Sequence, residues 1–142
     1  MAQQLHVDIV SAEGEIHHGP ATMVFAPAEM GEVGIAPRHA PLLTRLKPGT
    51  VRVQTPDGQE LSFFVGGGIL EVQPQLVTVL ADTALRAKDV DEAAALKARQ
   101  EAEAALSGAK TQMDMARAQA LVAEAAARLE FIKKLRTTVH GG

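Results

Sequence analysis

Hydrophobic and polar residues alternate with the period of β-strands in the first part of the chain. The segments LHVDI (5–9) and TVRVQ (50–54) alternate strictly, as strands with one buried face do. A further apolar run, Thr22 to Ala26, is expected to end before Pro27, because proline cannot donate a ladder hydrogen bond. The pattern therefore predicts short strands rather than helices.

Two hairpins are indicated by turn residues between such segments. A Pro-Asp-Gly turn at 56–58 predicts a hairpin over residues 50–65, since proline presets one dihedral and glycine accepts a positive one. Pro74 separates ILEV from LVTVLA and predicts a second hairpin over residues 69–81. Short strands with turns about every ten residues are typical of a sandwich. We predict an N-terminal antiparallel β-sandwich over residues 1–86.

The pattern changes to a helical one in residues 87–142. Ala, Glu, Lys and Arg dominate there, and these residues are strong helix formers. Asp89 and Glu92 form a capping-box pattern at the start of a first helix. Gly108 is expected to end that helix in the left-handed conformation, and Thr111 to cap a second one. The segment therefore predicts a C-terminal antiparallel two-helix hairpin.

Small residues mark the expected seam between the two helices. The first helix offers the stripe Ala94, Ala98, Ala102 and Ala105, and the second, expected over residues 113–137, offers Ala118, Val122, Ala125, Leu129 and Ile132. An alanine side chain buries little area, so the seam gains less than a leucine seam would at ~25 cal/mol per Å². We expect the helix pair to open at modest cost.

Composition excludes several functional classes. The 142 residues include 14 basic and 17 acidic side chains, for a formal net charge of -3, with 3% aromatics and neither Trp nor Tyr. Such a chain is not expected to bind nucleic acid. It has no Cys, hence no disulfide, thiolate ligand or cysteine nucleophile. No signal-peptide pattern and no apolar run near ~20 residues is present, so membrane association is expected only through partners.

The candidate catalytic and metal-binding residues are weak. His39 lies in a Gly- and Pro-rich stretch, residues 31–43, without Ser or Cys, so an interface role is favoured over a metal-dependent hydrolase. His17 and His18 are adjacent, would point to opposite faces of a strand, and are interpreted as a solvated turn rather than a metal site. The glycines at 66–68 precede a strand instead of a helix, which favours a bulge or close backbone approach over a phosphate loop.

The C-terminal segment RLEFIKKLR carries concentrated positive charge. Arg128, Lys133, Lys134 and Arg136 stand there against one acid, Glu130. These residues either complement the dipole at a helix C-terminus or contact an acidic surface of a partner. The sequence leaves these two interpretations open.

Three stretches together resemble a known family. GEVGIAPRHAPLLTRLKPGTVRV, GGGILEVQPQLVTVLADTALR and the helical tail are similar to the epsilon subunit of bacterial F-type ATP synthases, from about Leu5 to Leu135. The resemblance implies a non-catalytic rotor subunit that binds the gamma subunit and the c-ring at the cytoplasmic face of the inner membrane. It also implies that the helical hairpin extends toward the catalytic alpha and beta subunits and inhibits ATP hydrolysis.

The resemblance also implies roles for individual residues. Glu32, Arg38 and His39 belong to a loop that faces the c-ring and the base of gamma, and Ser11 and Thr44 match positions close to gamma. The basic residues of the second helix would meet the catalytic subunits in the extended state: Arg128, Lys133, Lys134 and Arg136. Residues 1–86 are thus expected to serve in rotor docking, and residues 87–142 in regulation.

The loop that carries these docking residues has a physical rationale of its own. Pro37 and Pro41 stiffen its backbone, which lowers the entropy cost of ordering it on binding. Leu42 and Leu43 are expected to anchor it to the core. The loop is therefore interpreted as a docking surface and not as an active site.

One departure from the family concerns nucleotide binding. Some members bind ATP in the folded hairpin through an Asp followed by an Arg on the first helix, and through arginines on the second. Here Asp91 and Arg128 are weak candidates, because Ala94 replaces the expected Arg and Glu124 occupies another such position. We predict weak or absent ATP binding, no cofactor and no metal site. The alternative is a nucleotide-sensing module that uses the hairpin.

Overall fold

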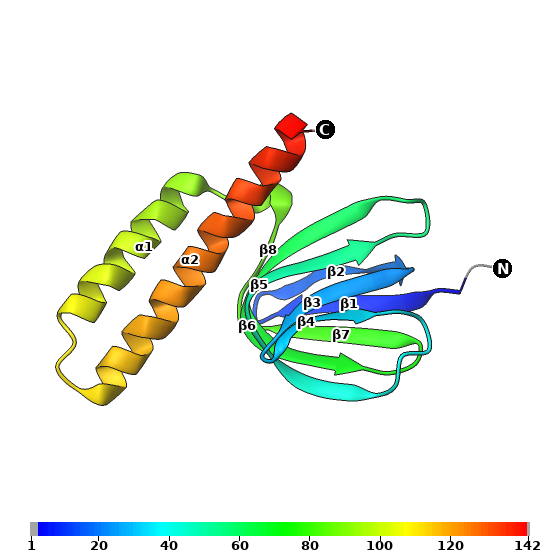
Figure 1. Cartoon of the computed structure of the whole chain (residues 1–142), viewed down its shortest axis with the longest axis horizontal. Helices are drawn as coiled ribbons and strands as arrows, with labels where there is room; N and C mark the ends of the chain where they lie inside the picture. The colour runs from blue at the N-terminus through cyan, green and yellow to red at the C-terminus, as the bar shows by residue number, and fades with distance from the viewer. Residues whose placement is uncertain (1–2, 142) are drawn as a thin grey trace. The chain divides into compact units, whose positions relative to one another are not determined.

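The computed structural model describes residues 3–141, with side chains described through residue 136. The chain divides into two compact units, Met1–Ala87 and Lys88–Gly142 (Figure 1). Eight strands form within the described part of the first unit: β1 (Leu5–Ser11), β2 (Gly14–Ala21), β3 (Met23–Ala28), β4 (Gly31–Ile35), β5 (Leu42–Gln54), β6 (Glu60–Val72), β7 (Leu76–Ala81) and β8 (Ala84–Arg86). A 3-10 turn, η1 (Ala87–Asp89), precedes the helices α1 (Glu92–Ser107) and α2 (Gln112–Gly141).

The eight strands join into one curled sheet, in the order β2-β1-β7-β6-β5-β3-β4, with β8 paired to β6. The predicted sandwich and helix pair are confirmed. The sheet differs from the expectation in one respect, because β1 and β7 run parallel while the other pairs are antiparallel. A parallel pair needs a long connection, and the chain supplies it by building the intervening strands between β1 and β7.

Both predicted hairpins form, with longer strands than the alternation indicated. β5 and β6 have 13 residues each and pair along almost their whole length. β6 also changes its second partner, pairing with β7 through residues 68–72 and with β8 through residues 63–65. The single strand β6 therefore hydrogen-bonds to β7 with one half of its length and to β8 with the other.

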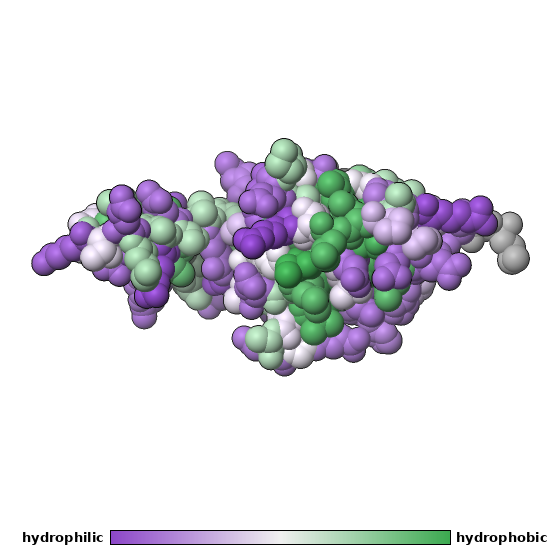
Figure 2. Space-filling model, turned by 90° about the horizontal axis from the view of Figure 1, so that it is seen from below, coloured by the Kyte–Doolittle hydropathy of each residue, from purple (hydrophilic) through white to green (hydrophobic). Residues whose placement is uncertain are grey.

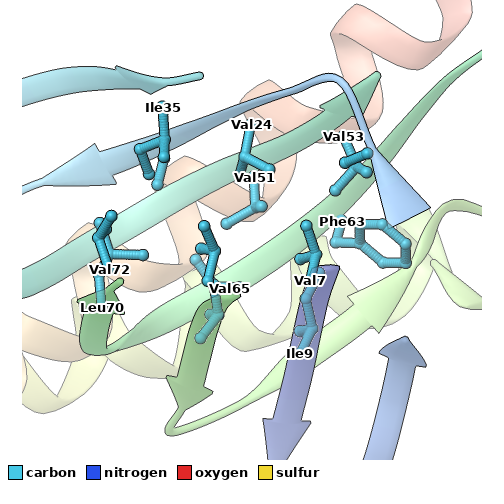
Figure 3. Packing of buried hydrophobic residues seen from close by; sticks show 14 of the residues in the cluster. Val7, Ile9, Val24, Ile35, Val51, Val53, Phe63, Val65, Leu70 and Val72 are labelled. Carbon is cyan, nitrogen blue, oxygen red and sulfur yellow. The ribbon is translucent and has the colours of Figure 1, made fainter. Parts of the chain in front are cut away.

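The core fills the interior of this curled sheet. Figure 3 shows side chains from β1, β3, β5 and β6 converging there. Its members face inward, mostly at every second position along the strands: Leu5, Val7, Ile9, Ala21, Val24, Ala26, Ile35, Leu46, Val51, Val53, Phe63, Val65, Leu70, Val72, Val77, Val79 and Ala81. All of these belong to the first unit, so that unit buries a core by itself. Each fully buried Val or Leu contributes about 1.5–3 kcal/mol relative to exposure.

The glycines at 66–68 mark the point where β6 changes partner. Gly67 and Gly68 have φ angles of 107° and 136°, which side chains rarely adopt. A Cβ atom on Gly68 would overlap the carbonyl oxygen of Leu80 on β7. The predicted close backbone approach is confirmed.

The prediction that β3 ends before Pro27 is wrong. β3 continues to Ala28, and Pro27 pairs with Glu32 of β4. On its other side, the pairing with β5 is interrupted between Phe25 and Ala28. Since a bulge there leaves no ladder donor to be lost, the proline is accommodated inside the strand.

The start and the end of α1 differ from the predicted caps. Asp91, not Asp89, is the N-cap, and its carboxylate accepts hydrogen bonds from the backbone N–H groups of Ala93 and Ala94 at 3.0 and 3.3 Å. Asp89 lies in η1 instead. Gly108 does cap the C-terminus, but with φ -92° rather than in the left-handed region. Its N–H bonds back into the last turn, so no positive φ is needed.

The second helix begins as predicted, and it runs further. The Thr111 hydroxyl accepts from the N–H of Asp114 at 3.0 Å, which confirms the cap. α2 then continues through Gly141, beyond the expected end at residue 137.

The helical seam is confirmed on α2 and partly wrong on α1. Ala118, Ala125 and Ile132 are buried on α2, as expected. On α1 the buried residues are Ala95 and Ala102. The predicted Ala94 and Ala105 are both exposed. Alanines occur all around this helix, so its apolar periodicity did not identify one face.

Candidate docking and regulatory surfaces

The loop between β4 and β5, residues 36–41, is held in one conformation. Arg38 adopts a left-handed φ of 68°, and its N–H donates to the carbonyl oxygen of Pro74 at 2.8 Å. The N–H of His39 donates to Ala36 at 3.1 Å within the loop. One of these hydrogen bonds lies within the loop, and the other attaches the loop to the turn between β6 and β7. Together they fix the backbone conformation of the loop.

The predicted docking residues around this loop occupy different environments. Glu32 lies on β4, is exposed, and accepts from Arg52 Nη2 at 3.3 Å. Arg38 is exposed, while His39 is half-buried and its Nδ1 donates to the carbonyl of Ala40 at 2.7 Å. Leu43 is 70% exposed, so the expectation that it anchors the loop to the core is wrong.

The other two predicted docking residues lie on separate elements. Ser11 ends β1, and its hydroxyl accepts from the N–H of Glu13 at 3.3 Å in the turn to β2. Thr44 is half-buried on β5, two positions from Leu42 and Leu46, which pack in the core. It therefore faces the inner side of β5 rather than the side that exposes Leu43.

A row of apolar side chains crosses the outer face of the sheet, half-buried at Val10 and exposed at Leu80 and Ile69, and the sequence pattern did not predict it. Val10 of β1, Leu80 of β7 and Ile69 of β6 are consecutive partners in the strand register. Leu80 is 49% exposed and Ile69 44%. Figure 2 shows a hydrophobic band on one face of the first unit. Single exposed apolar residues are ordinary, but a continuous row of them indicates a surface that a partner covers.

The sequence did contain a signal for this row. The segment LVTVLA of β7 carries leucines at positions 76 and 80 as well as the buried Val77 and Val79. Apolar residues on both faces of one strand are typical of sheets covered on both sides.

A groove of about 230 Å³ separates the helices of the second unit. Its lining residues are Ala98, Glu101, Ala102, Leu121, Glu124, Ala125 and Arg128. Arg128 Nη2 lies 3.4 Å from Glu124 Oε1, and a second carboxylate, that of Glu101, shares the groove. Asp91, the other candidate for nucleotide binding, is occupied as the N-cap of α1. This chemistry disfavours a polyphosphate, because the groove offers two carboxylates and one guanidinium.

The basic residues near the end of α2 fall into two groups. Arg136 forms an ion pair with Glu92 at the start of α1, so it bridges the two helices. Lys133 and Lys134 are exposed. A separation of the helices would therefore release Arg136 from Glu92.

Among the described residues of the first unit, His17 and Asp57 have a shifted pKa. Burial against Phe63, whose ring centroid lies 5.1 Å away, lowers the pKa of His17 below its ordinary value of 6.5, and the neighbouring His18 adds to this effect. The Thr55 hydroxyl donates to the Asp57 carboxylate and lowers its pKa below 3.8. Both histidines lie in β2, so their interpretation as a solvated turn is wrong.

Each unit matches a family description over most of its length. Residues 4–87 match the β-sandwich domain of ATP synthase delta/epsilon chains, and residues 88–133 match their long α-helix domain. The chain belongs to the ATP synthase delta/epsilon family. The ATP synthase epsilon chain of Nitrosococcus oceani is 65% identical over 136 residues, which cover 96% of this chain and 97% of that one. The epsilon chain of Stenotrophomonas maltophilia K279a is 57% identical over 135 residues, covering 95% and 96%. The resemblance to bacterial epsilon subunits is thereby confirmed.

Two of the solved structures that share this fold come from mitochondrial ATP synthases. A chain of the Euglena gracilis mitochondrial enzyme, described with its OSCP, F1 and c-ring, gives a TM-score of 0.74 at 19% identity, covering 87% of this chain and 78% of that one. A chain of the Tetrahymena thermophila central stalk and c-ring gives 0.67 at 13% identity, covering 92% and 97%. At these identities the likeness concerns the fold. Among the described residues, no helix combines the length and apolar character needed to cross a membrane.

Proposed function

We propose that this chain is a non-catalytic rotor subunit of a bacterial F-type ATP synthase, which joins the gamma subunit to the c-ring and restrains ATP hydrolysis. The observation that carries the proposal is similarity over 96% of the chain, at 65% identity to an epsilon chain. Its place is peripheral, on the cytoplasmic face of the inner membrane, where it is held by its partners.

The β unit is the docking part in this proposal. Its apolar row of Val10, Leu80 and Ile69 suits a lasting contact with a protein, for which we propose gamma, with Ser11 and Thr44 close to it. The loop that carries Arg38 and His39, together with Glu32 on β4, suits the polar loops of the c-ring. Because the loop backbone is already fixed, binding costs little ordering entropy.

The helical unit is the regulatory part. A seam made mostly of alanine gains little on closure, so the helices can separate at modest cost. Separation of the helices releases Arg136 from Glu92. The basic residues of α2 then contact acidic segments of the alpha and beta subunits and inhibit hydrolysis: Arg128, Lys133, Lys134 and Arg136.

The alternative, nucleotide sensing by the hairpin, finds less support. Glu101 and Glu124 line the groove beside Arg128, and both would repel a polyphosphate. Calorimetry with MgATP and the full chain is expected to give no saturable binding. Affinity in the micromolar range would favour the alternative.

The decisive experiment measures ATP hydrolysis by the catalytic head with its gamma subunit, after addition of the full chain or of a chain that stops after Ala87. A stop at this point retains β8 and the whole core. We expect both chains to bind and only the full chain to inhibit. Failure of the short chain to bind gamma, although folded by circular dichroism, would contradict the division of labour.

A further inference from the structure

Two histidines and an aspartate gather on the outer face of the sheet, where β1 meets β2. His6 and Asp8 are alternate residues of β1 and share a face, while Val7 and Ile9 point into the core. His18 lies directly opposite Asp8 in the β1–β2 register. One ligand atom from each of these three residues lies within 4.8 Å of the other two.

The side chains already turn toward one another. His6 Nε2 lies 3.0 Å from Asp8 Oδ1, and the rings of His6 and His18 approach edge to face with centroids 5.6 Å apart. His18 Nδ1 also lies 3.9 Å from Oε1 of Glu15, which stands three residues earlier on the same strand. The cluster thus has three convergent donors and a carboxylate beside one of them.

We propose that His6, Asp8 and His18 form a binding site for a divalent transition-metal ion such as Zn²⁺. Two imidazole nitrogens and one carboxylate oxygen are ligands that zinc accepts, and three protein ligands leave a position for water. Calcium and magnesium prefer sites made of oxygen, so they are disfavoured. Glu15 would orient the His18 ring from outside the ligand set, as carboxylates beside metal-bound histidines do.

Small side-chain movements complete this site. The ligands of a zinc ion lie roughly 2.0–2.2 Å from the metal, so the three donors must draw somewhat closer than they are now. The side chains of His6, Asp8 and His18 are 45%, 34% and 63% exposed, and their rotation displaces no core residue. The backbone, in contrast, is fixed by the β1–β2 ladder. The site is therefore largely preformed.

An ion here would join the outermost strand of the sheet to its neighbour. Among the described strands, β2 pairs within the sheet with β1 alone and ends the strand order at that side. A ligand that binds only the folded chain stabilises it by mass action. The sequence predicted no metal site because His18 stands next to His17, which faces Phe63 instead, while its partners His6 and Asp8 lie on another strand.

The test is a calorimetric titration of the full chain with Zn²⁺ alone, compared among matched variants. All carry His140→Gln, since that histidine lies outside the described side chains. We expect one equivalent of zinc to bind, and His18→Gln or Asp8→Asn to weaken the affinity more than about tenfold, the smallest loss typical of even a supporting residue. His17→Gln, next in sequence but on the opposite face, should bind zinc as the parent chain does. Equal affinity in the parent and in His18→Gln, or equal loss in His17→Gln, would overturn the proposal.

A second measurement avoids dependence on variant folding. Titration of the parent chain with paramagnetic Co²⁺ should broaden the ring-proton resonances of His6 and His18 before those of His17 and His39. Glu15→Gln should retain the site with weaker affinity, because Glu15 lies beside His18 and not among the three ligands. Broadening that begins at His39, or that affects all histidines alike, would show the proposed site to be wrong.

Discussion

At the residue scale, the local chemistry of single positions explains where the sequence was informative. Thr111 was identified as a cap because a cap-forming residue stands there just before a helical segment, and its hydroxyl does accept from the N–H of Asp114. Asp89 and Asp91 are both cap-forming residues two positions apart, and propensity alone could not choose between them. Leu43 looked like an anchor because it is apolar, yet its strand parity turns it outward. Which residues of β5 face inward depends on how this strand pairs with its neighbours, and the sequence alone does not determine that pairing.

Gly68 gives a sharp residue-scale prediction. Its replacement by alanine places a Cβ atom against the carbonyl oxygen of Leu80, at a φ of 136°. Gly14 has a similar φ of 129°, but no described atom outside its chain neighbours lies within 4 Å of its Cβ position. We expect Gly14→Ala to cost about 1–2 kcal/mol from backbone strain alone, and Gly68→Ala to exceed about 4 kcal/mol because the overlap adds to it.

Urea unfolding of the two glycine variants measures this difference. The slope of the free energy against denaturant should stay equal in both, so that the midpoints report stability directly. Equal destabilisation by Gly14→Ala and Gly68→Ala would show that β6 and β7 can move apart at no cost.

At the element scale, the hairpins and helices could be predicted, and their pairing could not. Turn residues at 56–58 and Pro74 identified two hairpins, because these turns are encoded locally. The parallel β1–β7 pair depends on contacts between residues about seventy positions apart, such as Val10 and Leu80. No local pattern carries that information. The continuation of β3 through Pro27 could not be predicted for a similar reason. The bulge that accommodates this proline lies opposite it, in β5, which is distant in the sequence.

The alanine seam of the helical unit leads to an element-scale prediction. Ala98 lines the groove of about 230 Å³ between α1 and α2. Ala98→Leu should fill part of it and stabilise the helix pair by ~1 kcal/mol, since cavity-filling changes commonly do so. Hydrogen exchange on the full chain should then slow in α1 and α2 and stay unchanged in β5 and β6.

The matched control for this variant is Ala93→Leu, on the exposed side of α1. It adds the same apolar side chain outside the groove, and replacing Ala by Leu changes intrinsic helix propensity only slightly. Exchange in α2 should therefore not change. In the parent chain we expect α1 and α2 to exchange faster than the ladder of β5 and β6. Uniformly slow exchange over residues 92–136 would contradict a weak seam.

At the scale of the whole molecule, the resemblance identified the family, while the residues alone indicated only a sandwich with a helical tail. The two family matches meet between residues 87 and 88, where the structure also divides into two units. The apolar row in the proposed docking surface could not be predicted, because it appears only when β1, β7 and β6 are placed side by side. The proposed ligand set of His6, Asp8 and His18 likewise exists only in the register of two strands.

The last prediction tests whether the positive end of α2 acts on the catalytic subunits. The double variant Lys133→Glu and Lys134→Glu reverses two exposed charges, and should weaken inhibition of ATP hydrolysis by about tenfold for each ~1.4 kcal/mol of lost attraction. The matched control, Lys97→Glu and Lys110→Glu, makes the same change in net charge at exposed positions of the same unit. Because exposed charges are screened by salt, the difference between the two variants should shrink at high ionic strength. Equal loss of inhibition in both would mean that total charge, and not the end of α2, sets the affinity.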